Sequence, residues 1–342
     1  MREIYEDSKK ITSLILSVFL ISGCQQNQEF NRDIYAMDTY INVSIYANND
    51  SLLEEVENKI YELENLLSIT KTSSDIYKIN NRTTSNVTVD METASLISDA
   101  LTIAKETNGA FDSTIYPALT TWGFTTDNYH IASEEELNNL KNIIGYNKVN
   151  IQKNVISLPT GMQIDLGGIA KGYTSDLIID YLKGHDIDSA LINIGGNVQT
   201  LGRNNNGELW KIGIYSPVIE SDFGIVNIED KAVITSGLYE RYFVGKDGNT
   251  YGHILDPNTL SPVNNDLLSV TIVCDDGKLG DALSTALFVM GKDEAYKYWQ
   301  SRNDFEAIFL TKDNQAFITE GLSDSFELTD SSKDMKLEVM KR

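Results

Sequence analysis

Apolar residues recur along the chain with two different periods, and the two periods predict different elements. A spacing of three or four residues places side chains on one face of a helix, whereas alternation places them on one face of a strand. Helical spacing, with capping residues or glycine at the ends, predicts five helices, over residues 51–67, 92–107, 133–145, 170–183 and 281–291. Two of them begin with the Ser-x-x-Glu pattern of a capping box, at Ser51 and Glu54 and at Ser133 and Glu136.

Alternating apolar residues predict seven strands, over residues 40–46, 190–194, 210–215, 232–235, 241–244, 269–273 and 306–310. Helices and strands do not follow a regular βαβ order. This favours an α+β fold, or an irregular α/β one, over a Rossmann sheet or a barrel. No proline- or glycine-rich linker divides the 342 residues, so we expect one compact unit, with or without two lobes. The charged residues 331–342 are expected to form a fraying tail.

The N-terminus has the pattern of a targeting segment. Lys9 and Lys10 precede an apolar run over residues 11–21, which is shorter than the about 20 residues of a membrane-spanning helix. The run ends in Leu20-Ile21-Ser22-Gly23-Cys24, which resembles the bacterial lipobox, whose cysteine is diacylated and becomes N-terminal. The alternatives are an ordinary signal peptide or a disordered N-terminus with a chance cysteine.

This pattern predicts the limits of the mature protein. We expect residues 1–23 to be a lipoprotein signal peptide and residues 24–33 to be a polar tether that is lipidated at Cys24. The functional domain then covers residues 34–330. Acyl chains at Cys24 would hold the domain on the extracytoplasmic face of a bacterial membrane.

Composition and charge exclude several classes of function. Asp and Glu number 50 against 28 Lys and Arg, a net charge of −22, and no basic patch is visible, so nucleic acid is not an expected partner. Such a chain binds a phosphate only if a metal ion or a helix N-terminus supplies local positive charge. The two cysteines form no disulfide framework and no zinc spacing. Cys274 lies in an alternating run and is expected to be a buried, inert thiol.

Two glycine-containing segments are candidates for chemistry. Residues 163–173 lead from a strand end through Gly167 and Gly168 into a helix. The free N–H groups at the start of this helix can hold a phosphate. The alternative is that the segment is only a turn. Asp281 and Thr285 are four residues apart, so on a helix they share one face and offer oxygen ligands that suit Mg²⁺. The alternative, which the sequence alone favours, is that Asp281 caps the helix.

Two further candidates involve ring side chains. His253 lies between Tyr251 and Pro257, and such a histidine is either structural or a base that works near neutral pH. Aromatic residues between Phe111 and Phe124 either stack on a flat ligand or pack in the core. None of the four candidates is decisive by itself.

Taken in order, these segments resemble the successive motifs of one family, the FAD:protein FMN transferases or ApbE family. The resemblance extends from about residue 31 to 320 and rests on eight segments: Met37-Asp38-Thr39-Tyr40, Phe111-Asp112-Ser113-Thr114, Trp122-Gly123-Phe124, residues 164–173, Asn193-Ile194-Gly195-Gly196-Asn197, Thr235-Ser236-Gly237, residues 253–257 and residues 281–286. It implies an ApbE-like mixed-sheet domain, with the FAD site between two lobes where the unit divides. Many members are bacterial lipoproteins, which agrees with Cys24.

The resemblance also implies an activity and its residues. Such enzymes use Mg²⁺, cleave the FAD pyrophosphate, attach FMN to a Thr or Ser of an acceptor with an Asp-Gly-x-Ser/Thr-Gly-Ala-Thr-like motif, and release AMP. His253 matches the base and Asp281 the main metal ligand, so both are the catalytic candidates. The other positions that match metal ligands are Gly168 and Thr285, with Ser284 beside them. Positions that match FAD contacts are Met37, Thr70, Trp122, Gly123, Phe124, Asp165, Lys171 and Leu255.

The resemblance leaves other functions open. Thr70 stands where many relatives have an aromatic residue, and Lys171 stands where several have Glu. Some relatives pass the FMN to water, so a periplasmic FAD pyrophosphatase is one alternative. A non-catalytic flavin-binding lipoprotein is another. Residues 247–252 loosely match the acceptor motif but depart from it at Tyr251, so we expect a turn there.

Overall fold

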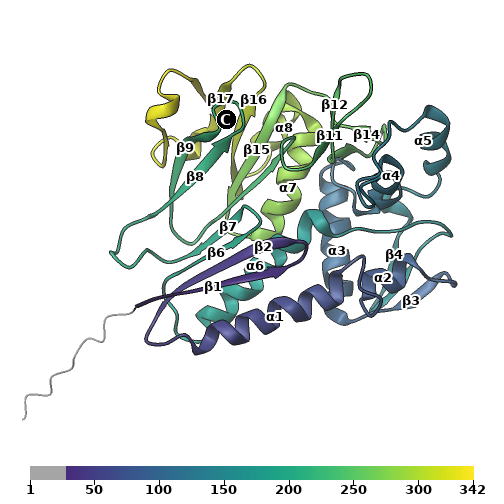
Figure 1. Ribbon diagram of the computed structural model, residues 1–342, viewed down its shortest axis with the longest axis horizontal. Coiled ribbons are helices and arrows are strands. Elements are labelled where there is room, and N and C mark those ends of the chain that lie inside the picture. The colour runs from purple at the N-terminus through teal and green to yellow at the C-terminus, as the bar shows by residue number, and fades with distance from the viewer. Residues whose placement is uncertain (1–27) are drawn as a thin grey trace, which may run out of the picture.

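A nine-stranded sheet runs through the molecule in the computed structural model, which describes residues 28–342 (Figure 1). Its order is β1 (Gln28–Ala36), β2 (Thr39–Ala47), β6 (Ala190–Ile194), β7 (Asn197–Leu201), β10 (Ala232–Gly237), β15 (Leu267–Cys274), β16 (Phe305–Thr311), β17 (Gln315–Thr319) and β19 (Lys336–Met340). All neighbours pair antiparallel except β17 and β19. This mostly antiparallel sheet confirms the α+β prediction, because regular βαβ units would give parallel pairs.

Within residues 28–342, all five predicted helices are present, together with three that the pattern did not predict. They are α1 (Ser51–Leu67), α2 (Asp75–Asn80), α3 (Met91–Glu106), α4 (Tyr116–Trp122), α5 (Glu134–Leu140), α6 (Gly167–Lys183), α7 (Gly277–Met290) and α8 (Lys292–Gln300). In the described part of the chain, short 3₁₀ turns cover Ser113–Ile115, Tyr146–Lys148, Glu320–Leu322 and Asp330–Ser332. The helices that the pattern missed, α2, α4 and α8, are short, and none has the capping box that marks the equally short α5.

Several predicted helix ends are wrong. The capping box at Ser133 is confirmed, but α5 ends at Leu140 and not at Gly145, because only Leu137 anchors it in the core. At α1 the predicted capping box is absent, since Asp50 precedes the helix and makes no side-chain cap. Both α6 and α7 begin earlier than predicted, so their first turns contain glycines that propensity disfavours.

Two layers cover the sheet. A second sheet of β18 (Phe326–Leu328), β9 (Ser221–Ile228) and β8 (Trp210–Ser216) packs on one face, and α6 and α7 pack on the other. Along β10, Ile234 joins the helical core while Val233 joins the core of the second sheet. Strands β15 and β16 are therefore buried on both faces and read as nearly continuous apolar runs.

A separate apolar cluster forms beside the main core. It joins α4 and α5 to β13 (Leu255–Asp256), which pairs with β14 (Ser261–Pro262), and Trp122 Nε1–H donates to the Leu260 carbonyl at 2.8 Å. Strands β11 (Tyr242–Val244) and β12 (Thr250–Gly252) pair next to it. Strands β3 (Asn86–Thr88), β5 (Val155–Ser157) and β4 (Asn150–Gln152) form another small sheet. In Figure 1, α4 and α5 lie at the opposite end of the molecule from the C-terminal strands.

The structure corrects the predictions for both chain ends. Residues 28–33, placed in the tether, belong to β1, which pairs with β2 along its whole length. Residues 331–342 are not a fraying tail, because β19 pairs with β17 and buries Met340. The signal peptide and Cys24 lie outside the described residues. Within residues 28–342, no helix has both the length and the hydrophobicity that crossing a membrane would require.

Two smaller predictions are confirmed. Cys274 is a buried thiol at the end of β15, and burial raises its pKa well above the ordinary value. Residues 247–252 include the turn between β11 and β12, in which the Asp247 carboxylate accepts from the Asn249 N–H at 3.1 Å.

Candidate active site

The site begins where the N-terminal halves of α6 and α7 cross in direct backbone contact. A Cβ atom added to Gly172 would lie 2.0 Å from the carbonyl oxygen of Gly277, so only glycine fits at this point of α6. The Gly172 N–H donates to Asp281 Oδ2 at 3.0 Å. The close approach therefore brings a carboxylate of one helix onto the backbone of the other.

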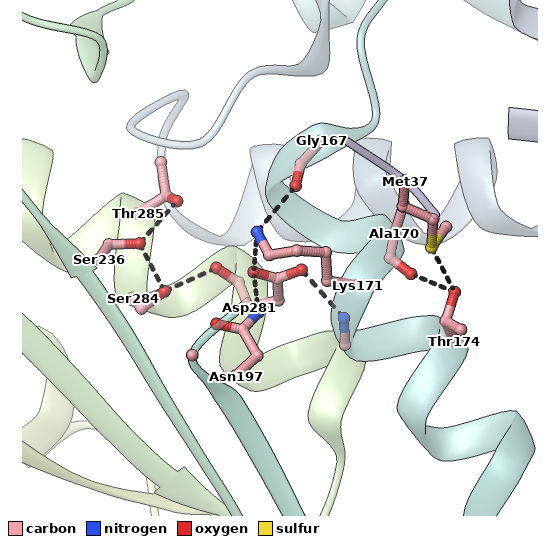
Figure 2. Close-up of polar contacts among 12 residues, drawn as sticks. Met37, Gly167, Ala170, Lys171, Thr174, Asn197, Ser236, Asp281, Ser284 and Thr285 are labelled. Atoms are coloured by element: carbon pink, nitrogen blue, oxygen red, sulfur yellow. Dashed lines mark hydrogen bonds and ion pairs between the residues drawn. The ribbon is translucent and has the colours of Figure 1, made fainter. Parts of the chain in front are cut away.

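Asp281 is the buried acid of this crossing, with 2% of its surface exposed. Oδ1 accepts from the Asn197 side-chain amide at 2.9 Å, and the Lys171 ammonium lies 3.7 Å from the same oxygen (Figure 2). The Asp281 charge is the largest of the causes that raise the pKa of Lys171. Asp276 caps α7 by accepting from the Leu279 N–H, so the cap interpretation of Asp281 is wrong.

Thr285 lies one turn after Asp281 and faces the same space. A Cβ on Gly168 would be 3.6 Å from Thr285 Oγ1, so the start of α6 lies opposite this hydroxyl. Ser236 Oγ is 3.3 Å from Thr285 Oγ1 and 2.8 Å from Ser284 Oγ. Ser284 donates to the Asp281 carbonyl at 2.8 Å and lies outside the cavity wall, because its helix position turns it toward β10 (Figure 2).

A cavity of about 320 Å³ opens over this crossing. Eight of the predicted site residues line it: Phe124, Asp165, Gly168, Lys171, His253, Leu255, Asp281 and Thr285. Its wall combines residues of the main core with Phe124 and Leu255 of the separate cluster around α4 and α5. The size falls at the lower end of the range of small-molecule sites.

The remaining predicted residues lie outside the cavity wall. Met37 is in the β1–β2 turn, where its sulfur accepts from the Thr174 hydroxyl at 3.5 Å, and its neighbour Asp38 reaches the wall. Thr70 is exposed, and its neighbour Ile69 lines the wall instead.

The first two residues of the Trp-Gly-Phe motif also act from behind the cavity wall. Trp122 is buried, with its ring 5.5 Å from that of Tyr251. Gly123 ends α4 in a left-handed conformation at φ 88°. This turn directs the next residue, Phe124, into the wall.

His253 is held in one protonation form by the backbone. Its Nδ1 lies 3.1 Å from the carbonyl oxygen of Arg241, which only accepts, so Nδ1 carries the proton and Nε2 keeps its lone pair. Burial, together with the weaker effect of the positive charges of Lys171 and Arg241, lowers the pKa of His253 from 6.5 to about 4, although the hydrogen bond to the Arg241 carbonyl opposes the shift. At neutral pH the ring is therefore an uncharged base on the cavity wall.

Two acids on the same wall have raised pKa values. Burial raises the pKa of Asp165, while the Gly167 N–H, which donates to Oδ1 at 2.8 Å, opposes the shift. Withdrawal from bulk water raises the pKa of Glu240 from 4.5 to about 7, with Lys171 opposing and Asp281 adding to the shift. Carboxyl groups that share a cleft with few cations disfavour their charged forms.

The sequence patterns missed three residues of this site. Glu240 and Arg241 line the wall, and Asn197 fixes Asp281. Asn197 belongs to the segment 193–197 of the family resemblance, but the resemblance assigned it no role. Glu240 and Arg241 follow the Thr235-Ser236-Gly237 segment by a few positions. The available signal was a charged pair at the start of the predicted strand 241–244, of which Glu240 is the preceding residue and Arg241 the first.

Comparisons with known proteins agree with this geometry. The sequence model of the ApbE family matches residues 37–309. The FAD:protein FMN transferase of Klebsiella pneumoniae is 31% identical over 299 residues, which are 86% of this chain and 92% of that protein. The crystal structure of the ApbE protein from Thermotoga maritima is 32% identical with a TM-score of 0.78, and the match covers 90% of this chain and 99% of that one.

A second solved structure extends the likeness. The flavin transferase ApbE from Vibrio cholerae is 28% identical with a TM-score of 0.76, again over 90% of this chain and 99% of that one. The matched residues include both helices of the crossing and the segment around His253. This chain therefore belongs to the ApbE family.

Proposed function

We propose that the chain is a FAD:protein FMN transferase, which moves FMN from FAD to a Thr or Ser hydroxyl of an acceptor protein. One observation carries the proposal: a neutral histidine base, His253, lines the same cavity as the carboxylate and hydroxyl of Asp281 and Thr285. Phosphoryl transfer needs a base near the attacking hydroxyl and compensation of the phosphate charge. The relative from Klebsiella pneumoniae bears the same activity in its name.

In the proposed reaction, the acceptor hydroxyl oxygen attacks the phosphorus on the FMN side of the pyrophosphate. A new P–O bond forms the phosphodiester, the bond to the bridging oxygen breaks, and AMP leaves with that electron pair. The hydroxyl proton passes to Nε2 of His253, the ring nitrogen that the Arg241 carbonyl leaves free. The Lys171 ammonium lines the same cavity and offsets charge on the phosphate oxygens.

The residues at the helix crossing fit a bound Mg²⁺. Within residues 28–342, no group of three His, Cys, Asp or Glu could hold a metal. The ligands that the family resemblance implies are the Asp281 carboxylate, the Thr285 hydroxyl and the Gly168 carbonyl. Mg²⁺ commonly binds with few protein ligands, keeping waters and substrate phosphates. The Lys171 ammonium near Asp281 Oδ1 indicates that this oxygen still attracts a cation. When bound, Mg²⁺ supplies positive charge to the phosphate oxygens.

The FAD contacts follow from the cavity wall. We assign Phe124 and Leu255 to the ring systems, because they are the apolar members of the wall among the predicted contacts. Asp165 and Lys171 are the polar members, close to the start of α6. Met37, Thr70, Trp122 and Gly123 act through their neighbours in this proposal, since they lie behind the wall.

The acceptor and the location are part of the proposal. The acceptor carries an Asp-Gly-x-Ser/Thr-Gly-Ala-Thr-like motif, and a lipid on Cys24 holds the enzyme on the extracytoplasmic face of a bacterial membrane. The lipobox-like segment before Cys24 supports the anchor. Cys24→Ala should move the protein from the membrane fraction to the soluble fraction, since Cys274 is far along the chain and buried. Unchanged fractionation on immunoblots would contradict the anchor.

The activity is tested by incubating the protein with FAD and Mg²⁺, with and without an acceptor that carries the motif. We expect AMP release that depends on the acceptor and an FMN adduct on the acceptor by mass spectrometry. Free FMN with AMP and no adduct would identify a FAD pyrophosphatase instead. FAD binding without AMP release would identify a non-catalytic flavin-binding protein.

A further inference from the structure

Asp176, on the third turn of α6, holds the first turn of α7 from across the helix crossing. Its Oδ1 accepts from the Gly277 N–H at 2.8 Å, and its Oδ2 accepts from the Lys278 N–H at 2.8 Å. These N–H groups belong to the four at a helix start that have no partner within the helix. One carboxylate of α6 therefore fixes α7 at two adjacent points, in addition to the cap that Asp276 provides from its own chain segment.

A strand of the main sheet braces this contact. The Gln199 side-chain amide donates to Asp176 Oδ1 at 2.7 Å, and its carbonyl oxygen accepts from the Ser175 hydroxyl. Asn197, two residues earlier on β7, donates to Asp281 at 2.9 Å. Residues two apart on a strand share a face, so β7 directs one amide to each of the two carboxylates at the crossing.

The backbones of α6 and α7 touch directly between these hydrogen bonds. Gly172 and Gly277 meet backbone to backbone, and a Cβ on Gly277 would lie 2.7 Å from Gln199 Oε1 and 2.9 Å from Ser175 Oγ. Gly277, Asp281 and Thr285 follow one another at intervals of four residues along α7. A shift of the first turn along or around the helix axis therefore carries Asp281 and Thr285 with it.

We propose that Asp176 and Gln199 are positioning residues for the transfer reaction, which set the register of α7 against α6 and so hold Asp281 and Thr285 at the cavity. This inference rests on the proposed function. Neither residue lines the cavity, so both act only through α7. Burial raises the pKa of Asp176 to about 6, which leaves the carboxylate charged at neutral pH and facing the N-terminus of the helix.

The main test compares Asp176→Asn with a control at the same helix end. Asn has nearly the same shape but loses one acceptor, so one of the three donors at this point is left without a partner. The control is Asp276→Ala, which removes the exposed cap of α7 and is expected to lower Tm by about 2–4 °C without changing the contact between the helices. Gln199→Leu is a second variant, which keeps the side-chain volume and tests the inference if Asp176→Asn does not fold.

Three measurements are made on each purified protein. They are kcat and KM for FAD, the affinity for Mn²⁺ alone from the electron paramagnetic resonance signal of the free ion, and hydrogen exchange of peptides that cover 277–285. For Asp176→Asn we expect kcat and Mn²⁺ affinity to fall about 10–100-fold with KM for FAD nearly unchanged. Exchange should be faster at 277–285. Gln199→Leu should shift all three in the same direction by less.

The possible results distinguish a positioning role of Asp176 from a purely stabilising one, and failure of this inference from failure of the proposed function. If Asp176→Asn and Asp276→Ala lose kcat in the same proportion to their loss of Tm, Asp176 only stabilises the fold and the inference is wrong. Unchanged Mn²⁺ affinity in Asp176→Asn would also overturn it. If the wild-type protein transfers no FMN, the proposed function fails, whereas the Mn²⁺ and exchange data still decide whether Asp176 positions α7.

Discussion

The cavity has two walls that are built in different ways. The helix wall, residues 167–172 and 277–285, is fixed by backbone contact at Gly172 and by two N–H groups that donate to buried Asp281. The hairpin wall, residues 240–257, holds His253 through one carbonyl, that of Arg241. The Arg241 side chain itself pairs with exposed Asp127 at 3.3 Å. Changes in the helix wall should therefore alter stability and activity together, whereas loss of the His253 side chain from the hairpin wall should alter activity alone.

The largest expected effect tests the hairpin wall. His253→Ala removes the base that takes the proton of the acceptor hydroxyl, and loss of a general base typically slows a reaction about 10²–10⁴-fold. FAD affinity should hardly change, because the ring and phosphate contacts lie elsewhere on the wall. Single-turnover transfer, with FAD binding followed by fluorescence, gives both numbers.

His253→Asn is the control for this variant. Its amide can still donate to the Arg241 carbonyl from the place of Nδ1, but it offers no basic nitrogen. Transfer should be as slow as in His253→Ala, with a Tm close to that of the wild type. If transfer, FAD affinity and Tm all fall by similar proportions, His253 packs the hairpin and is not the base.

Asp281→Ala is the corresponding change in the helix wall. Transfer should fall about 10²–10³-fold, as when a group that stabilises transition-state charge is removed. The free energy of unfolding should fall as well, by about 1–3 kcal/mol, because the Gly172 N–H and the Asn197 amide lose their buried acceptor. Urea unfolding alongside AMP release measures both. Full stability in this variant would remove the distinction between the walls.

Gly172→Ala changes the crossing without removing any polar group. Its new Cβ meets the Gly277 carbonyl, so the helices must move apart, and overpacking of this kind costs about 1–3 kcal/mol of stability. Transfer should fall with it, because Asp281 and Thr285 move with α7. Gly184→Ala, exposed at the other end of α6 with φ −66°, is the control and should change stability by less than about 0.5 kcal/mol.

Sequence patterns predicted best what lies within one element. The i, i+4 spacing of Asp281 and Thr285 was enough to place both on one face of a helix, and both line the cavity. The capping role of Asp281 was wrong because glycines hid the first turn of α7 and Asp276 caps it instead. Propensity argues against a helix that starts Gly-Lys-Leu-Gly, and only the contact with α6 explains it.

Residues that meet across elements were the hardest to predict. Glu240 and Arg241 line the wall from the segment between β10 and β11, and the alternation that predicts a strand over residues 241–244 does not indicate which cavity its first residue faces. The same holds for Asp176, whose partners on α7 are about a hundred residues away. Polar strands at the ends of the chain were missed because pairing with β2 and β17, and not their own hydrophobicity, holds them in the sheet.

The smallest predicted effect concerns Glu240, which belongs to the hairpin wall but interacts with Lys171 of the helix wall. Its folded-state pKa of about 7 exceeds the ordinary 4.5, so the folded protein binds more protons between these values. The stabilisation from Glu240 is therefore fully present below pH 4.5 and is lost as pH rises through about 7. His253 contributes in the opposite sense, because its folded-state pKa of about 4 lies below the ordinary 6.5. The stabilisation from His253 is present above pH 6.5 and is lost as pH falls through about 4.

Glu240→Gln isolates the Glu240 contribution from that of His253. The amide does not titrate, so the free energy of unfolding of the variant, relative to that of the wild type, should increase from pH 5 to pH 8. His253 contributes equally to both proteins. The gain should be modest, because Glu240 keeps an exposed surface at the cavity and solvent screens its charge. Urea unfolding of both proteins at the two pH values measures it. A difference that stays constant with pH would show that Glu240 titrates normally, and that the charges of the two walls are not coupled through it.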